Sequence, residues 1–180
     1  MSKPRKKRLD EHRAEAASRE HVRPPHVYLI LDNIRSLNNV GAILRLADGC
    51  GVRKIYLCGI TPSPPRPEIA KISLGAEKSV EYEWMEDPAR AVVLLRNSGV
   101  HVVAVEQVHG AKPLHRYPFE EPLALVFGHE TVGVDEQVLN LCDAVVELPM
   151  FGAKHSHNVA TCAGIVLYEV RRQWLERQGD

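Results

Sequence analysis

The sequence lacks long hydrophobic runs and has few cysteines. No apolar stretch in the 180 residues approaches the roughly 20 that a transmembrane helix needs, and the N-terminus is charged. The four cysteines are scattered and form no C-x-x-C pair, a pattern that favours neither a disulfide framework nor a zinc site. We therefore expect reduced thiols in a cytoplasmic protein that is not bound to a membrane.

Two common nucleotide-binding motifs are also missing. No G-x-x-x-x-G-K-[ST] occurs, so a P-loop is not expected. The stretch GCGVRK (49–54) begins like G-x-G-x-x-G, but Lys54 replaces the last glycine, and the stretch precedes a predicted strand instead of opening a helix. A classical dinucleotide site is therefore not expected either.

Charge is balanced over the whole chain but unevenly distributed. Residues 1–25 contain eight Lys or Arg and four acids, which leaves fifteen basic and nineteen acidic residues in the remainder. A basic segment on a mildly acidic body suits contact with phosphates, although a solvated tail is the alternative. We predict a flexible basic arm over 1–25 and one domain over 26–180, which is long enough to bury a core.

Apolar runs and helical patterns alternate along the domain. Predicted strands cover 26–33, 54–60, 100–107, 123–128 and 144–150, and predicted helices cover 40–47, 68–77, 87–99, 134–142 and the C-terminal segment. Such alternation predicts an α/β fold around a mainly parallel sheet. Ligands of these sheets bind beyond the carboxyl ends of the strands. The candidate site loops therefore follow Leu31, Val105, Phe127 and Leu148.

The first unusual group of residues lies in the helix around 40–47. Arg45 follows Asn39 by six positions and Gly41 by four, within an otherwise apolar pattern. Arginine is rarely buried without a partner. Arg45 therefore either serves a ligand or extends along the helix until its head meets water or an acid such as Asp48.

A second group follows the apolar strand at 123–128. Gly128, His129 and Glu130 come directly after it, and Gly133 lies three residues further on. Glycines allow positive φ and a close approach of backbone to ligand, and a glutamate accepts hydrogen bonds from an arginine fork. A glycine turn that carries a solvated acid is the alternative.

The third group, LPMFGAKHSHNV (148–159), precedes the last helix. Ser156 or Asn158 can cap that helix, but one cap does not explain the whole polar run. Free backbone N–H groups at a helix N-terminus also bind anionic or polar ligands. His155 and His157 are only two residues apart and no acid accompanies them, so we do not expect a metal site.

Together and in this order, the three groups resemble the motifs of the SpoU/TrmH family of RNA 2′-O-ribose methyltransferases, within the SPOUT superfamily. The N-x-G-x-x-x-R motif is matched by Asn39, Gly41 and Arg45, and G-x-E-x-x-G by the glycines and glutamate of 128–133. LPMFGAKHSHNV is similar to the third motif. ISLGAE (72–77) and AVEQ (104–107) are secondary matches, and the likeness extends over about residues 26–170.

The resemblance implies a doubly wound sheet whose C-terminal segment forms a deep trefoil knot. It also implies a homodimer with the last helix in the interface. In that helix, small residues would permit close packing and larger ones would supply apolar area; they are Ala160, Ala163 and Gly164, and Ile165, Leu167 and Trp174.

The resemblance further implies transfer of a methyl group from S-adenosylmethionine to a ribose 2′-OH of RNA, without a metal. The implied cofactor-binding residues are Val105, Gly128, Leu148, Met150, Ser156 and His157. The implied catalytic residues are Asn39, Arg45, Glu130, Ser156 and Asn158. The predicted RNA-binding residues are Lys6, Lys7, Arg8, Arg35, Arg45 and Lys154. His157 departs from the Leu or Met that is usual in the family.

Arg45 is the residue to which the family assigns the ribose hydroxyl. Because guanidinium groups do not lose their proton in proteins, we expect Arg45 to hold the ribose-phosphate and to stabilise the developing alkoxide. A phosphate oxygen or water remains as the proton acceptor.

Two other functions are compatible with the sequence. One is a catalytically silent RNA-binding protein, against which the intact Arg45, Glu130, Ser156 and Asn158 argue. The other is a SPOUT base methyltransferase, against which the pairing of Asn39 with Arg45 argues. The short basic arm, with no separate RNA-binding domain before the core, favours tRNA over ribosomal RNA.

Overall fold

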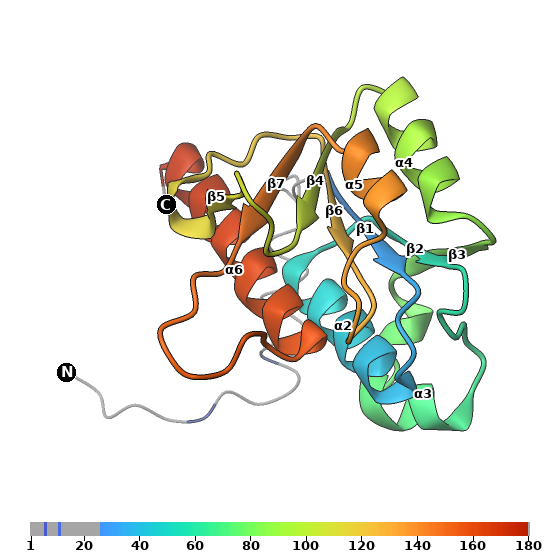
Figure 1. The fold of residues 1–180 in the computed structure, drawn as a ribbon. Helices are drawn as coiled ribbons and strands as arrows, with labels where there is room; N and C mark the ends of the chain where they lie inside the picture. Colours follow the sequence, from blue (N-terminus) through green and yellow to red (C-terminus); the bar gives the residue numbers. More distant parts are fainter. Residues whose placement is uncertain (1–5, 7–10, 12–25, 180) are drawn as a thin grey trace.

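The computed structural model describes residues 6, 11 and 26–179, so most of the predicted arm lies outside the described part. A seven-stranded sheet runs through the molecule, with helices on both faces (Figure 1). All paired strands are parallel, in the order β3-β2-β1-β6-β4-β7-β5. The predicted α/β class and parallel sheet are confirmed.

The strands and helices alternate as the sequence pattern predicts. The strands are β1 (Val27–Asp32), β2 (Lys54–Cys58), β3 (Glu81–Met85), β4 (His101–Val105), β5 (Lys112–Pro113), β6 (Leu123–Phe127) and β7 (Ala144–Glu147). The helices are α2 (Leu37–Cys50), α3 (Pro67–Ser73), α4 (Pro88–Asn97), α5 (Glu136–Leu141) and α6 (Val159–Gln178), with single 3₁₀ turns η2 (Ala76–Lys78) and η3 (Leu114–Arg116).

Two strands were not predicted, and both lie at edges of the sheet. No residue of β3 is fully buried, so its pattern lacks the continuous apolar run that marks the inner strands. β5 has only two residues and pairs only with β7, which is too short a segment to leave a pattern. In contrast, all five residues of β6 are buried, because helices cover both faces of the inner strands.

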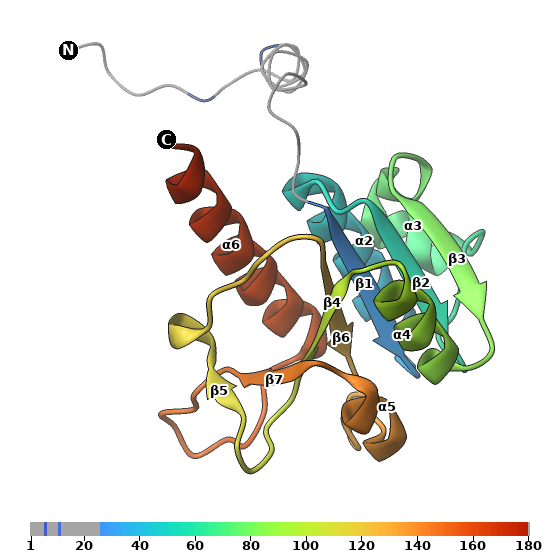
Figure 2. The same ribbon diagram turned by 90° about the horizontal axis from the view of Figure 1, so that it is seen from above.

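Two apolar layers hold the helices to the sheet. Leu29 and Leu31 pack with α2 and α6 on one face, whereas Ile30 and Tyr56 pack with α4 and α5 on the other. Figure 2 shows α2 and α6 on the opposite side of the sheet from α4 and α5. Successive side chains of a strand point to opposite faces, so a single apolar strand supports both layers. The carboxyl edge of the sheet stays open for loops.

Capping fixes the start and the end of α2. The Ser36 hydroxyl accepts a hydrogen bond from the Asn39 backbone N–H at 3.3 Å, which satisfies one free donor of the first turn. At the other end Gly51 adopts φ 67° and donates its N–H to the carbonyls of Ala47 and Asp48. The N-terminus of α2 is thereby set beside the carboxyl end of β1.

Gly41, the glycine of the first motif, permits close packing of two helices. A Cβ at this position would lie 2.8 Å from Ile72 Cβ and 2.9 Å from the carbonyl oxygen of Ile69, both on α3. Neither neighbour is the free end of a flexible chain, so any larger residue would push α3 away from α2.

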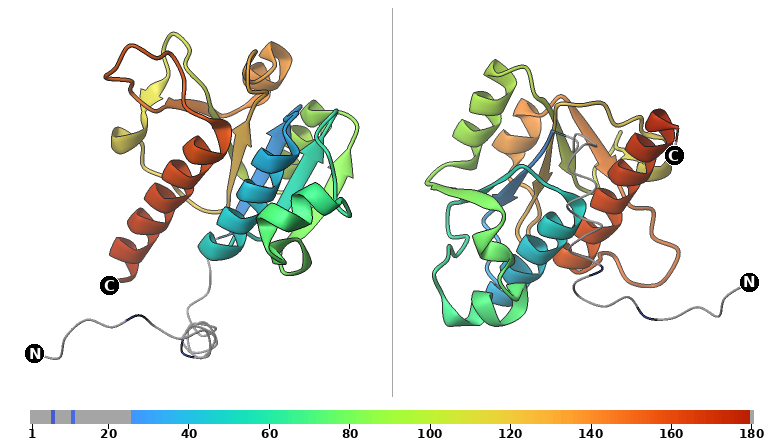
Figure 3. Two further views of the ribbon diagram at one scale, coloured as in Figure 1. Left: turned by 90° about the horizontal axis from the view of Figure 1, so that it is seen from below. Right: turned by 180° about the vertical axis from the view of Figure 1, so that it is seen from behind.

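Helix α6 lies beside α2 (Figure 3). Four of the residues that we expected at a dimer interface are buried inside the chain instead: Ala160, Ala163, Leu167 and Trp174. Their apolar surface is buried within the chain itself and is not exposed to a partner. Ile165 and Tyr168 remain outside, with 42% and 70% of their surface exposed.

No helix in the described part of the chain has both the length and the apolar character needed to cross a membrane.

Candidate functional site

The Glu130 carboxylate joins the loop after β6 to the N-terminus of α2. One oxygen accepts from the Arg35 backbone N–H at 3.0 Å. The other accepts from the Ser36 N–H at 3.0 Å and from Asn39 Nδ2 at 2.9 Å. Burial raises the pKa of Glu130, but these donors outweigh burial and hold the pKa below its usual value. Glu130 is therefore ionised at neutral pH, and the positive end of the α2 dipole adds to the stabilisation of its charge.

Asn39 extends this contact to the start of α6. Asn158 Nδ2 donates to Asn39 Oδ1 at 3.1 Å. The Asn158 side-chain oxygen accepts from the N–H groups of Ala160 and Thr161 at 3.0 and 3.2 Å, so Asn158 also caps α6. Glu130, Asn39 and Asn158 thus form one hydrogen-bonded chain that contains a residue from each of the three motifs. We call it the motif chain.

A cavity of about 170 Å³ lies on one side of the motif chain, at the ends of β4, β6 and β7. We call it the strand-end cavity. Its lining residues are Val105, Glu106, Gln107, Phe127, Gly128, His129, Glu130, Thr131, Gly133, Leu148, His155, Ser156, His157, Val159 and Cys162. Five of the six predicted cofactor-binding residues are among them. The exception is Met150, which is half-buried and lies outside the lining.

Gly128 brings two segments of backbone together at the wall of this cavity. A Cβ there would lie 2.1 Å from the Val134 backbone nitrogen and 2.2 Å from the Gly133 carbonyl carbon. No side chain fits in that space, so only glycine allows the turn of residues 129–133 to fold back against the end of β6.

A second hollow, which we call the α2–α6 groove, opens on the other side of the motif chain. Arg45, Asn39 and Asn158 line it, with apolar residues of both helices. Arg45 is exposed and makes no hydrogen bond or ion pair with any residue that the structure describes. Its neighbour Asp48 instead accepts from the Ser79 hydroxyl at 2.6 Å. The guanidinium is therefore not held by the surface acid that we considered for it.

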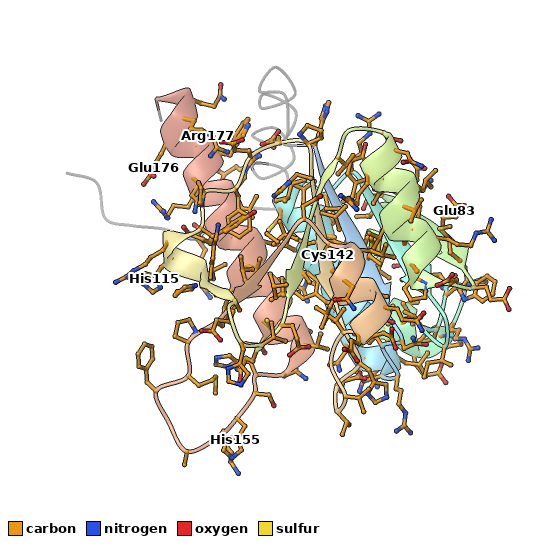
Figure 4. All side chains as sticks on the ribbon, turned by 45° about the horizontal axis from the view of Figure 1, so that its top comes forward. Glu83, His115, Cys142, His155, Glu176 and Arg177 are labelled. Carbon is orange, nitrogen blue, oxygen red and sulfur yellow. The ribbon has the colours of Figure 1, made fainter. Side chains whose placement is uncertain are left out.

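The other predicted polar residues lie on exposed segments. Lys154, Ser156 and His157 belong to the loop between β7 and α6, in which every residue from 151 to 158 is exposed. Figure 4 shows this loop, with His155 on it, standing away from the sheet. Arg35 is exposed just before α2, and Lys6 is exposed as well. Lys7 and Arg8 lie outside the described residues.

Several cavity residues were not predicted from the sequence. Glu106 directly follows the last residue of β4, and a polar residue at the end of a parallel strand is the signal that identifies it. His129 was quoted only as a neighbour of Glu130. Its Nδ1 accepts from the Thr131 N–H at 3.0 Å, which fixes the ring against the turn.

Cysteines and other possible metal ligands do not cluster. Within residues 26–179, together with 6 and 11, no group of three or more His, Cys, Asp or Glu side chains is arranged to hold a metal. The four cysteines are free thiols. Burial raises the pKa of Cys162, in the wall of the strand-end cavity, to about 12, and the charge of Glu106 adds to this shift.

The arrangement of motifs and strand ends is matched by known proteins. The model of the SpoU rRNA methylase family matches residues 26–168, which is most of the chain and includes all three motifs. The chain belongs to the SpoU rRNA methylase family. The family resemblance that the motifs indicated is thereby confirmed.

Family relatives include enzymes named for two kinds of RNA. A 23S rRNA (guanosine-2′-O-)-methyltransferase of Neisseria meningitidis is 32% identical over 86% of this chain and 61% of its own length. A tRNA (guanosine(18)-2′-O)-methyltransferase of Thermus thermophilus is 31% identical over 86% of this chain and 78% of its own length. The chain thus spans about three-fifths of the ribosomal RNA relative.

Solved structures of SpoU proteins share the fold. AviRb of Streptomyces viridochromogenes, solved in complex with the cofactor AdoMet, matches with a TM-score of 0.78 and 28% identity, over 88% of this chain and 64% of that one. The Aquifex aeolicus TrmH/SpoU tRNA modifying enzyme matches with a TM-score of 0.80 and 27% identity, over 94% and 87%.

Proposed function

We propose that the chain is an S-adenosylmethionine-dependent methyltransferase that acts on a ribose 2′-OH of RNA. One observation carries the proposal. The motif chain of Glu130, Asn39 and Asn158 separates a cavity, backed by glycine, from a groove that contains an exposed arginine. Such a division suits a reaction that brings two different molecules together at one point.

The strand-end cavity fits the cofactor. Gly128 lines the cavity, and because it has no side chain the backbone of Gly133 and Val134 packs directly against it at the cavity wall. Val105, Phe127 and Leu148 supply apolar walls, and Ser156 supplies a hydroxyl. A mixture of apolar walls and a few polar groups is typical of small-molecule sites. When bound, the cofactor supplies a methyl group on a sulfonium, and the chain's residues hold and orient it.

The α2–α6 groove fits the ribose and its phosphate. Arg45 offers five N–H donors that no described residue occupies, and a guanidinium binds phosphate through two parallel bonds. A guanidinium does not act as a base in proteins, so Arg45 positions the nucleotide and stabilises negative charge on the 2′ oxygen. The proton of the ribose 2′-OH is taken up by a phosphate oxygen or by water.

Glu130 and the two asparagines act as positioning groups. The Glu130 carboxylate is already engaged by three donors, and its lowered pKa makes it a weak base. It therefore holds Asn39 in place, and Asn39 holds Asn158. The first turns of α2 and α6 are thereby held beside the cavity, so that the proposed cofactor and nucleotide sites stay adjacent.

The substrate is proposed to be tRNA or ribosomal RNA, since relatives named for each match the chain at about the same identity. Both relatives are named for guanosine, so guanosine ribose is the first nucleotide to test. The predicted arm over 1–25, together with Lys154 and Arg35, is proposed to contact phosphates. The cytoplasm is proposed as the place of action.

Alkaline hydrolysis of labelled RNA tests the proposal. The protein is incubated with methyl-labelled cofactor and with total tRNA or ribosomal RNA, and the RNA is then cleaved with alkali. Alkaline cleavage needs a free 2′-OH, so ribose methylation leaves the label in dinucleotides. Label in mononucleotides would instead show base methylation, and absence of label with both RNAs would favour a silent binding protein.

We also propose a homodimer through α6. The apolar part of the α2–α6 groove leaves Ile165 and Tyr168 exposed beside Leu46 and Gly164, and a second copy of this surface would cover them. The ribose and its phosphate would then bind beside this interface, where Asn39, Arg45 and Asn158 lie.

We propose, finally, that the C-terminal segment is threaded as a trefoil knot, as the resemblance implies. Supporting this, β7 lies between β4 and β5, and the loops after β4 and β7 line the same cavity. Stretching the chain from residues 26 and 179 by force tests it. A knotted chain stops short of its full contour length of about 3.3–3.6 Å per residue, whereas full extension would refute the knot.

A further inference from the structure

Glu106 occupies the strand-end cavity but belongs to none of the three motifs. It is half-buried and follows the end of β4. Its Oε1 accepts from the Gln107 N–H at 2.8 Å, and its Oε2 accepts from the Val134 N–H at 2.9 Å. One side chain thus joins the loop after β4 to the loop after β6, across 28 positions of sequence.

The loop that Glu106 holds is the one that carries Glu130. Residues 129–133 form a closed turn, in which the N–H of each end residue, His129 and Gly133, donates to the carbonyl of the other at 3.0 and 2.9 Å. Glu130 lies within this turn. Glu106 therefore fixes the far end of the turn, while Glu130 fixes its near end to α2.

Gly133 packs against the Glu106 carboxylate without any spare room. A Cβ on Gly133 would lie 2.2 Å from Glu106 Oε2, and the residue has φ +76°, which side chains rarely adopt. The contact therefore needs both residues: a carboxylate at position 106 and a residue without a side chain at position 133.

The carboxylate also has acceptor sites to spare. An ionised carboxylate accepts about four hydrogen bonds, and described donors occupy two of them on Glu106. Glu106 lines the cavity together with Cys162, whose pKa its charge helps to raise. A ligand with hydroxyl or amino donors would find these acceptors at the cavity wall.

We propose that Glu106 is a further cofactor-binding and positioning residue, which fixes the 129–133 turn and accepts hydrogen bonds from the hydroxyl or amino groups of the ligand in the strand-end cavity. This inference rests on the proposed function. Glutamine keeps only one side-chain oxygen, so it can accept from only one of the two backbone N–H groups, and its NH₂ group faces the second one. The turn is therefore held less firmly, and the acceptor that faces the ligand is lost.

Calorimetry with S-adenosylhomocysteine tests the inference on the whole chain. Glu106→Gln is expected to weaken binding by about tenfold or more, and Glu106→Ala by more still. The exposed Glu86→Gln, which removes the same charge outside the cavity, is the matched control and should bind like wild type. If wild type binds no ligand, the proposed function fails. If wild type and Glu106→Gln bind equally, only the role of Glu106 fails.

Steady-state kinetics separates positioning from general damage to the fold. KM for the cofactor should rise about tenfold in Glu106→Gln, whereas kcat at saturating cofactor should fall less, because Glu130 keeps its own three donors at the start of α2. A fall in kcat alone, with an unchanged KM for the cofactor, would overturn the assignment.

Gly133→Ala perturbs the same contact without replacing Glu106, and by itself it should also weaken ligand binding, so it replaces Glu106→Gln as the test if that variant does not fold. The alanine collides with Glu106 Oε2 in the wild-type background but not in Glu106→Ala. The loss of ligand affinity caused by Gly133→Ala should therefore be smaller in the Glu106→Ala background. Equal losses in both backgrounds would show that the two residues are not coupled.

Discussion

At the scale of single residues, the site depends on which charged groups are already engaged. Glu130 has three donors within 3.0 Å, whereas Arg45 has no described partner. A carboxylate that is satisfied within the fold stabilises the site, and a guanidinium that is left free is suited to a substrate. The two residues of opposite charge are thus suited to different tasks, although both belong to motifs of the same family.

Arg45→Ala should lower methyl transfer at saturating RNA and cofactor by about 100-fold or more, because the proposed charged donor to the reacting ribose is removed. Binding of S-adenosylhomocysteine and the free energy of unfolding should stay unchanged, since Arg45 lies outside the strand-end cavity and is exposed. Arg45→Lys keeps the charge but loses the planar fork, and should remain impaired.

Arg53→Ala is the matched control for this change. Arg53 is also exposed, but it precedes β2 at the opposite end of the sheet. Its replacement should leave turnover unchanged. Turnover near the wild-type rate in Arg45→Ala would remove Arg45 from the mechanism.

Glu130→Gln should lower the free energy of unfolding at pH 7 by about 1–3 kcal/mol, because one amide oxygen cannot serve three donors. The folded-state pKa of Glu130 lies below its ordinary value of 4.5, so the unfolded chain takes up the proton first as pH falls. The difference between wild type and Glu130→Gln should therefore be full above about pH 4.5 and shrink below it. Urea unfolding at a series of pH values measures it.

A pH-independent difference would contradict this account of Glu130. Glu86→Gln, in which an exposed carboxylate is replaced, should show no comparable loss at pH 7.

At the scale of elements, helix α2 contains two glycines, of which Gly41 packs against α3 and Gly49 has no neighbour within 4 Å of a Cβ. Gly41→Ala should destabilise the fold by about 1–3 kcal/mol, because its Cβ would meet α3. Gly49→Ala meets nothing within 4 Å and should stabilise α2 by about 0.5–1 kcal/mol. Urea unfolding of the two variants compares them directly. Equal effects would show that helix propensity, not packing, decides both.

The ends of a helix were predictable where capping residues, proline or glycine mark them in the sequence. Asp87, Pro88 and Gly99 delimit α4 as expected, and Asn158 caps α6 as one of two candidates. β3 was missed because an edge strand has no buried run. The buried face of α6 could not be predicted, because Leu167 and Ile165 are both apolar and only the packing against the rest of the fold shows that Leu167 is buried and Ile165 is exposed.

The individual motif residues of the site were predictable from the sequence, but the contacts between them were not. The motifs identified Asn39, Glu130 and Asn158 individually, but the bonds between them join segments 91 and 119 residues apart, which spacing alone does not show. Glu106 was missed because its partner, a backbone N–H at Val134, leaves no mark on the sequence.

At the scale of the whole molecule, the exposed apolar residues of α6 point to assembly. Ile165→Glu should shift a dimer toward monomer in sedimentation, because a charge would be buried against the partner copy. Val93→Glu is the matched control, since Val93 is 43% exposed on α4, across the sheet, against 42% for Ile165. A monomeric wild type, or an equal response in both variants, would contradict the proposed interface.

The motif chain also has a consequence for synthesis of the protein. Asn39 is translated 119 positions before Asn158, and Glu130 lies between them. Synthesis runs from the N-terminus, so α2 and all seven strands leave the ribosome before Asn158, the residue that completes the motif chain. Termination anywhere between Glu130 and Asn158 therefore yields a product that contains Asn39 and Glu130 but lacks Asn158. Such a fragment would lack the side-chain cap of α6 and one wall of the α2–α6 groove.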